Sequence, residues 1–334
     1  MVSVDPLVTI CIPAFNSEKW IEESICSALA QTWPNKEIII VDDGSTDRTN
    51  QIIREYESSN VKIIEQENKG ACAARNKALN IAKGDFIQWL DADDILAPDK
   101  IARQLQNSDM NPESMTLHSC SWGHFYYCLS RAKFEPSPLW RDLSSLDWLL
   151  TSFNTRHMMP NHAWLVSRKI TNLAGQWNEN IKINQDGEYF CRVVSSCEHV
   201  KYHSESVCFY RKGNVGSITA RKKSLEAISF AYNLCVDNLL KYKNDSITRA
   251  AAISFLKDFV SSYYDDGSEV FIENKKRILI LGGTDELPCV SMRYKIAKKI
   301  FGNKGAVNLK SKTSSLKINI EKRIDKLLRL FGCR

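Results

Sequence analysis

Acidic side chains gather after two apolar runs in the first hundred residues. The run 36–43 ends in a pair of aspartates, and the run 85–91 leads into Asp91-Ala92-Asp93. Carboxylates held close together repel one another, and a divalent cation removes this repulsion. Hard oxygen ligands suit Mg²⁺ or Mn²⁺ completed by substrate phosphates, and a leaving diphosphate needs its charge neutralised. The spacing therefore predicts a metal-assisted site for a diphosphate substrate, with Asp91 and Asp93 as metal ligands.

A competing interpretation is that these aspartates simply cap the helices that follow the strands. We prefer that interpretation for Asp47 and Asp99, but one cap does not need several carboxylates, so we favour the metal for Asp91 and Asp93. No glycine loop of the G-x-G-x-x-G type follows the first apolar run, and no P-loop pattern occurs anywhere in the sequence. Dinucleotide-dependent dehydrogenases and P-loop kinases are therefore disfavoured.

The elements that must position these residues alternate between strand and helix. Strands are predicted at 7–13, 36–43, 61–66 and 85–91, and helices at 17–31, 46–56 and 71–82. This alternation predicts an α/β fold with a mostly parallel central sheet and helices on both faces. Because ligands bind beyond the carboxyl ends of such strands, we expect Pro13–Asn16 to join the two acidic strand ends at one edge.

Beyond about residue 110 the pattern becomes less regular. Further sheet, possibly antiparallel, is predicted at 115–129, a short helix at 146–153, and strands at 161–170 and 207–211. The stretch 224–262 is helical in character. We therefore expect an α/β domain over 1–217, divided near 105 by this change of pattern, and a helical C-terminal region over 218–334.

Charge is distributed unevenly along the 334 residues. The net charge is +6, and residues 301–334 contain nine Lys and Arg against two acidic residues, a balance of +7 that leaves −1 for the rest. A nearly neutral body gives no reason to expect nucleic-acid binding. The end of the chain can be drawn as a helix whose apolar stripe, Leu316, Ile320, Ile324, Leu327, Leu328 and Phe331, is surrounded by basic residues. Such a helix could lie on an anionic membrane or pack on the body, and the sequence leaves both open.

No run of about 18 apolar residues occurs, so no transmembrane helix is expected. The N-terminus lacks the basic start and the cleavage site of a signal peptide. The eleven cysteines are scattered through apolar segments, and we expect most of them to be reduced core residues. These features predict a cytoplasmic protein, with the tail as a possible peripheral contact to the inner face of the plasma membrane.

Four ordered motifs resemble the inverting GT-A glycosyltransferases of family 2. They are VTICIPAFNSEKWIEESICSALAQTW, EIIIVDDGSTDRT, NKGACAARNKAL and GDFIQWLDADD. The resemblance covers about 1–105 strongly and continues more weakly to about 217 through WLVSRKI, QWNENI, NQDGEYF and YRKGNVGS. It implies transfer of a sugar from a nucleotide-sugar donor, with UDP and Mn²⁺ or Mg²⁺ as expected components.

The resemblance also implies roles for individual residues. Asp43 would read the uracil base by accepting from its N3–H. Asp93 would be the direct metal ligand, with Asp91 facing ribose or sugar. The remaining implied donor-binding residues surround the base or close over the donor: Pro13, Ala14, Phe15, Asn16, Lys69, Gly70, Arg75 and Ala92. For Arg75 the alternative is a salt bridge to one of the acidic strand ends.

Inverting transfer needs one general base for the acceptor hydroxyl. The family carries it in an acidic pair well after the metal motif, and the best match here is Gln185-Asp186, which predicts Asp186 as the base. Glu188 is the reserve candidate, and a helix-capping role for Asp186 is the alternative. On the acceptor side, Trp164 and Trp177 could stack on a sugar but are more typical of core. Contacts to substrate by His157, His162, Arg211 and Lys212 are weaker hypotheses.

The resemblance predicts a glycan or a lipid-linked glycan as acceptor, in the synthesis of a bacterial surface polysaccharide or glycolipid. A sugar-1-phosphate nucleotidylyltransferase shares the strand and helix alternation, but it would need a glycine-rich loop near the N-terminus that the sequence lacks. A non-catalytic protein that binds nucleotide sugars would keep Asp43 without needing Asp91, Asp93 and Asp186 together.

Overall fold

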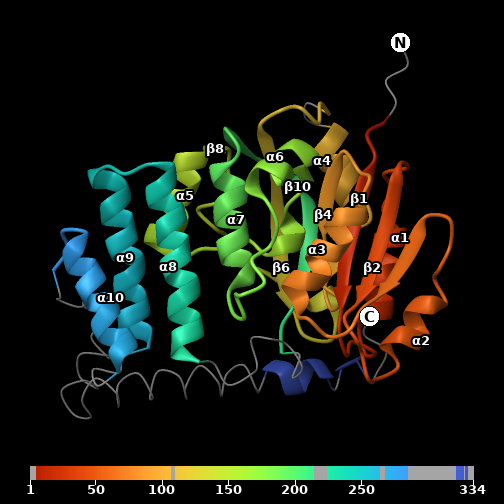
Figure 1. Cartoon of the computed structure of the whole chain (residues 1–334). Coiled ribbons are helices and arrows are strands. Elements are labelled where there is room, and N and C mark those ends of the chain that lie inside the picture. The colour runs from red at the N-terminus through yellow and green to blue at the C-terminus, as the bar shows by residue number, and fades with distance from the viewer. Residues whose placement is uncertain are drawn as a thin grey trace.

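The N-terminal part of the chain is built on a five-stranded sheet, seen at the right of Figure 1. The computed structural model describes residues 5–106, 110–213, 224–263, 268–284, 321–326 and 328–329. The strands are β1 (Val8–Ala14), β2 (Lys36–Asp42), β3 (Val61–Glu65), β4 (Phe86–Trp89) and β9 (Val166–Ser167), in the order β3-β2-β1-β4-β9. The first four are parallel and β9 is antiparallel. The predicted parallel sheet is confirmed.

Helices connect the parallel strands, as the alternation predicted. They are α1 (Ile21–Leu29), α2 (Thr49–Arg54) and α3 (Ala71–Ile81), followed by α4 (Lys100–Gln106). The chain builds outward from β1 to β2 and β3, then returns to place β4 on the other side of β1. The end of β1 is therefore the point where the strand order reverses, which is where open α/β sheets bind ligands.

A second, mixed sheet follows. It contains β5 (Ile95–Leu96), β6 (Thr116–Phe125), β7 (Lys133–Phe134), β8 (Leu143–Ser144) and β10 (His199–Arg211), with a short 3₁₀ turn η1 (Leu129–Arg131). Its longest contact, between β6 and β10, is parallel, whereas β5, β7 and β8 pair antiparallel to their neighbours. The antiparallel pairing predicted for 115–129 is therefore wrong for β10, its main partner. The two strands lie about eighty residues apart in sequence, so no local pattern reveals how they pair.

The strand predicted over 161–170 is also mostly wrong. The segment instead forms a 3₁₀ turn, η2 (Asn161–Ala163), the two-residue strand β9, and the start of helix α6 (Arg168–Ala174). Ser167 caps α6 by accepting a hydrogen bond from the backbone N–H of Ile170. A short buried apolar run does not distinguish strand from helix by its pattern, and here the serine cap starts a helix.

Five longer helices complete the described fold. They are α5 (Ser145–Thr155), α7 (Gln185–Ser195), α8 (Leu225–Tyr242), α9 (Ser246–Ser262) and α10 (Glu269–Ile280). Figure 1 shows α7, α8, α9 and α10 side by side, leading away from the sheet. Buried side chains of α8 and α9 belong to the same apolar core as those of the first sheet. The helical extension is thus present, while the predicted boundary near 217 lies outside the described residues.

The C-terminal segment, here residues 321–326, 328 and 329, is helical and packs on the body. Asp325 in this segment is buried, and its carboxylate accepts from the backbone N–H groups of Tyr127 at 2.6 Å and Cys128 at 3.0 Å. This corresponds to the packed alternative for the part of the tail that the structure describes. Leu316, Ile320, Leu327 and Phe331 of the predicted stripe lie outside the described residues. No described helix is both long and apolar enough to cross a membrane.

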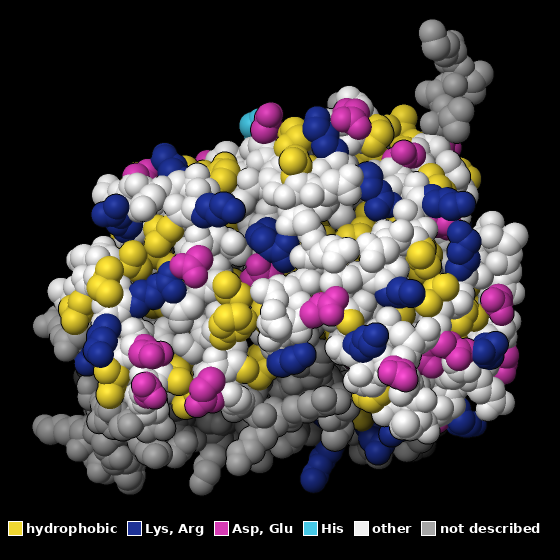
Figure 2. Space-filling model, viewed as in Figure 1, with side chains coloured by type: hydrophobic (Ala, Val, Ile, Leu, Met, Phe, Trp, Pro, Cys, Tyr) yellow, Lys and Arg dark blue, Asp and Glu magenta, His cyan; other side chains and the backbone are white. Residues whose placement is uncertain are grey.

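Figure 2 shows one face of the molecule, on which cationic and anionic side chains are interspersed. Of the nine described cysteines, all but Cys26 are buried, and each is a free thiol. The prediction that the cysteines are mainly core residues is confirmed for this part of the chain.

Candidate donor and acceptor site

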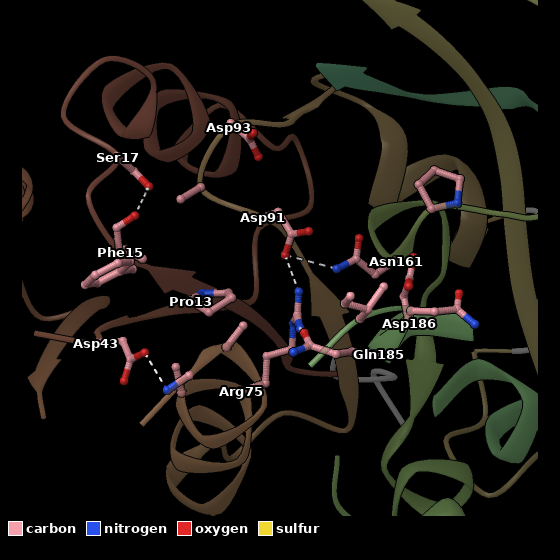
Figure 3. Close-up of a pocket in the computed structure, with 18 of the residues that line it drawn as sticks. Pro13, Phe15, Ser17, Asp43, Arg75, Asp91, Asp93, Asn161, Gln185 and Asp186 are labelled. Carbon is pink, nitrogen blue, oxygen red and sulfur yellow. Dashed lines mark hydrogen bonds and ion pairs between the residues drawn. The ribbon is translucent and has the colours of Figure 1, made fainter. Parts of the chain in front are cut away.

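A cleft of about 580 Å³ opens at the carboxyl ends of β1, β2 and β4, a size typical of small-molecule sites. It brings together nearly all predicted site residues: Pro13, Ala14, Phe15, Asn16, Asp43, Gly70, Arg75, Asp91, Ala92, Asp93 and Asp186. Lys69 is the exception, because only its backbone takes part. Figure 3 shows Asp43 at one end of this cleft and Asp186 at the other, with Asp91 and Arg75 between them.

Asp43 is anchored by the loop that precedes α3. One carboxylate oxygen accepts from Gln66 Nε2 and from the backbone N–H of Lys69, and the other accepts from the backbone N–H of Gly70, each at 2.8 Å. Gly70 has a φ of +96°, a conformation that glycine adopts without strain. The carboxylate therefore fixes the loop at the entrance to α3, and it is 2% exposed.

The turn after β1 is tied to the turn after β2. Asn16 has a φ of +47°, and its side-chain oxygen accepts from the backbone N–H of Thr46 at 2.8 Å. Its own backbone N–H donates to Ser45 Oγ at 3.0 Å, and Asp42 accepts from the backbone N–H of Ser45 at 3.1 Å. These hydrogen bonds hold the wall made by Pro13–Asn16 against the turn that carries Asp43.

Arg75 lies at the centre of the cleft and pairs with Asp91. Its Nη2 is 2.7 Å from Asp91 Oδ1, and its Nη1 donates to Gln185 Oε1 at 3.2 Å. The guanidinium lies 4.4 Å from the ring centre of Trp177, a cation–π contact. The predicted salt bridge alternative for Arg75 is therefore observed. Asn161, which the sequence did not identify, donates to the same oxygen of Asp91 at 3.0 Å.

The surroundings of Asp91 favour its charged form. Burial by itself would raise the pKa of this carboxyl, but the Arg75 guanidinium and the Asn161 amide lower it, and the net pKa lies below the ordinary value. An oxygen that already accepts from an arginine is less available to a cation. The division in which Asp93 is the direct metal ligand and Asp91 faces ribose or sugar stays a prediction.

The donor set fits a hard divalent cation only in part. Asp91 and Asp93 both line the cleft with partly exposed side chains. The described part of the chain contains no group of three or more His, Cys, Asp or Glu residues able to hold a metal. A cation here would therefore take its remaining ligands from donor phosphates and water, which is the usual arrangement for Mg²⁺.

Arg211 donates hydrogen bonds to the turn that carries Asp93 and Asp94. Its Nε donates to the backbone carbonyl of Asp93 at 2.8 Å, and its backbone N–H donates to Asp94 Oδ1 at 2.8 Å. Asp94 is fully buried and its other oxygen pairs with His162 Nδ1 at 3.0 Å. Burial raises the pKa of Asp94, and although burial opposes it, the pairing raises that of His162. Hence His162 has a structural role beneath the site.

Asp186 lies in the first turn of α7, across the cleft from Asp91 (Figure 3). Burial raises the pKa of its carboxyl; Arg75 opposes this and Asp91 adds to it, and the net pKa is raised. A raised pKa brings a carboxylate closer to the range useful to a general base. The helix begins after Asn184 without a side-chain cap, so the capping alternative for Asp186 is wrong.

The reserve base is not available. Glu188 is buried, and its two oxygens accept from Arg192 Nε at 2.7 Å and Nη2 at 2.9 Å, with Asn238 Nδ2 at 3.1 Å. These contacts link α7 to α8. Glu188 also does not line the cleft, which leaves Asp186 as the carboxylate of this helix that reaches the site.

The acceptor end differs from expectation in its aromatic residues. Trp164 is fully buried and Trp177 is 2% exposed. Trp177 stacks on Tyr189 with ring centres 3.9 Å apart. Both tryptophans are therefore core residues, while His157 and Lys212 are absent from the cleft wall. The cleft is lined instead by residues the sequence did not single out: Met158, Pro160, Ile183, Tyr210, Ile228, Tyr232 and Tyr263.

The fold is of the GT-A type, with carboxylates at the ends of β2 and β4. The chain superposes on TarS residues 1–349 of S. aureus in complex with UDP-GlcNAc with a TM-score of 0.65, at 17% identity, covering 98% of this chain and 92% of that one. Residues 9–171 match the family model described as glycosyl transferase family 2. This segment, just under half of the chain, is therefore similar to glycosyltransferase family 2.

Two curated relatives match shorter stretches of the chain. TuaG of Bacillus subtilis, which carries the name of a teichuronic acid biosynthesis glycosyltransferase, is 39% identical over 132 residues, 39% of this chain and 50% of TuaG. The Escherichia coli protein named UDP-Glc:alpha-D-GlcNAc-diphosphoundecaprenol beta-1,3-glucosyltransferase WfgD is 43% identical over 102 residues, 30% of this chain and 40% of WfgD. The chain thus spans half or less of the length of these two relatives.

Proposed function

We propose that this chain is an inverting, metal-dependent glycosyltransferase that moves a sugar from a UDP-sugar to an acceptor hydroxyl. The observation that carries the proposal is the cleft itself, with Asp43 at one end, Asp186 at the other and the Asp91–Asp93 turn between them. Of the relatives, one is named for UDP-Glc and a lipid-linked acceptor, and one neighbour holds UDP-GlcNAc. We extend both features to this chain as a UDP-sugar donor and a glycan or lipid-linked glycan acceptor, in bacterial surface polysaccharide or glycolipid synthesis.

The donor half binds and orients. Asp43 holds the loop at Gly70 in place and lies beside Pro13–Asn16, so a uracil base fits between the loop and that wall. Arg75 and Asn161 keep Asp91 charged and directed into the cleft, where it would meet ribose or sugar hydroxyls. A donor bound in this way would present its anomeric carbon toward α7. Such positioning supplies much of the entropic advantage of a bound reaction.

The acceptor half would remove one proton. Asp186 would accept it from the attacking hydroxyl as the bond to the anomeric carbon forms and the bond to the diphosphate breaks. A single base opposite the leaving group gives inversion at the anomeric carbon. Asp93 would hold a Mn²⁺ or Mg²⁺ ion, and when bound such an ion neutralises the charge of the leaving diphosphate.

A donor screen tests the proposal. Binding of UDP-, GDP- and dTDP-sugars is measured by calorimetry with and without Mn²⁺, on the wild type and on Asp93→Ala. We expect Mn²⁺ to strengthen UDP-sugar binding about tenfold or more in the wild type and to have little effect in the variant. Binding that is equally strong without metal would reject the metal role, and binding of none of the three would reject the proposed function.

Two alternatives differ in their readouts. A nucleotidylyltransferase would release pyrophosphate from UTP and a sugar-1-phosphate, and a non-catalytic protein would bind UDP-sugar without consuming it.

We propose a cytoplasmic location, with the C-terminal tail as a peripheral contact to anionic membrane. Ile324 and Leu328 of that tail are partly exposed, at 47% and 37%. Deletion of residues 310–334 should then release the protein from anionic vesicles, and unchanged partitioning would reject the contact.

A further inference from the structure

Three charged side chains connect the C-terminal segment (residues 321–326, 328 and 329) to the turn that carries Asp93. Arg329 Nη2 donates to Glu23 Oε1 at 2.6 Å, and the other oxygen of Glu23 accepts from Arg211 Nη2 at 2.5 Å. Arg211 in turn donates from Nε to the carbonyl of Asp93 at 2.8 Å. An uninterrupted series of charge-assisted hydrogen bonds therefore links the end of the chain to the metal turn.

Aromatic rings stabilise the same series. The Arg211 guanidinium lies between Trp20 and Phe125, 4.2 and 4.3 Å from their ring centres, and Arg329 lies 5.1 Å from the Trp20 ring. The Arg211 side chain is only 1% exposed. A planar guanidinium enclosed in this way has one available orientation, so its Nε fixes where the Asp93 carbonyl can lie.

The segment has its own attachment. Asp325 is 3% exposed and accepts from the backbone N–H groups of Tyr127 and Cys128, just past the end of β6, and its other oxygen is 3.3 Å from Arg131 Nη1. A second ion pair joins Glu321 to Lys133 at 3.0 Å. A carboxylate that accepts two backbone hydrogen bonds holds the turn at a fixed place beside β6, which is what places Arg329 over Glu23.

We propose that residues 321–326, 328 and 329 form a clasp that positions the Asp93 turn for cation and diphosphate, acting through Arg329, Glu23 and Arg211. The inference rests on the proposed function for its ligand, a divalent cation with a nucleoside diphosphate. Arg329, Glu23 and Arg211 are positioning residues, since each acts on the ligand through the Asp93 backbone. Arg329 therefore acts on the site from outside the cleft, although it lies more than two hundred residues from Asp93 in sequence.

The test uses the full chain and a matched pair of arginines. Arg323 and Arg329 lie in the same segment, and Arg323 is exposed. For Arg323→Ala, Arg329→Ala and Arg329→Lys, binding of UDP is measured by calorimetry over a Mn²⁺ series. Hydrogen exchange at residues 91–95 is measured on the metal-free protein. Thermal unfolding of each variant separates a local effect from general destabilisation.

We expect Arg329→Ala to weaken the apparent Mn²⁺ affinity roughly threefold, because the Arg329–Glu23 pair is partly exposed. It should also speed exchange at 91–95 several-fold, leave metal-free UDP binding unchanged, and be partly rescued by Arg329→Lys. Arg323→Ala should match the wild type. Equal behaviour of Arg329→Ala and Arg323→Ala in both assays would overturn the clasp. If Mn²⁺ fails to affect UDP binding in the wild type, the metal role falls instead, and hydrogen exchange still decides for or against the clasp.

Discussion

The two ends of the cleft are held in different ways. At the donor end, Asp43 and Asp91 accept short hydrogen bonds from the loop before α3, from Arg75 and from Asn161. At the acceptor end, Asp186 stands in the first turn of α7 with a raised pKa that burial causes. One end is therefore held by short hydrogen bonds, whereas burial at the other end disfavours the charged form of Asp186. This difference fits the proposed roles, donor binding at one end and proton removal at the other.

The largest effect is expected from Asp186→Asn. The loss of a general base costs roughly 10²- to 10⁴-fold in rate, and the donor end is untouched, so sugar transfer should nearly vanish while UDP affinity stays within about twofold. Initial rates and calorimetry on the same preparation measure both.

Glu188→Gln is the matched control, two residues away on the same helix. It should lower the unfolding temperature because it weakens the buried pair with Arg192, yet keep most of the activity. If Asp186→Asn instead kept full activity, Asp186 would not be the general base.

A smaller effect is expected from Asp43→Asn. Replacing a charged acceptor of three hydrogen bonds weakens contacts worth about 1.5–3 kcal/mol each, so we predict a loss in UDP affinity of roughly 10- to 100-fold. Asp42→Asn is the comparator, because Asp42 binds Ser45 and Asn50 without lining the cleft. Equal losses in the two variants would indicate that Asp43 acts only through the shape of the turn.

The smallest effect concerns stability and its dependence on pH. Because the folded-state pKa of Asp186 is raised, its contribution to stability is present at acidic pH and is lost as pH rises through that pKa. Asp186→Asn should therefore be the more stable protein at neutral pH, by about 0.5–2 kcal/mol. The advantage should disappear in acid. Urea unfolding of both proteins at pH 4 and pH 8 measures this, and a variant that is less stable at pH 8 would contradict the burial of a charged carboxylate.

The sequence predicted the donor end well and the acceptor end poorly, for physical reasons. Strands such as Lys36–Asp42 are continuous buried runs whose ends are visible locally, so Asp43 and Asp91 could be placed at one sheet edge. Asn161 meets Asp91 across seventy residues and lies in a segment mistaken for strand. Tyr210 lies on β10 and Tyr232 on α8, both far in sequence from the strand ends that carry Asp43 and Asp91. Arg329 was assigned only to the basic surround of an apolar stripe and Asp325 was not singled out, because no local pattern reveals their partners.

The most direct test of the account is the stereochemistry of the first product. With the UDP-sugar identified by the donor screen and water as acceptor, proton NMR at early times records which anomer of the free sugar forms first. A single base opposite the leaving diphosphate predicts the anomer of inverted configuration, and its formation should be lost in Asp186→Asn. Release of the retained anomer would contradict the assignment of Asp186 and the proposed inverting mechanism.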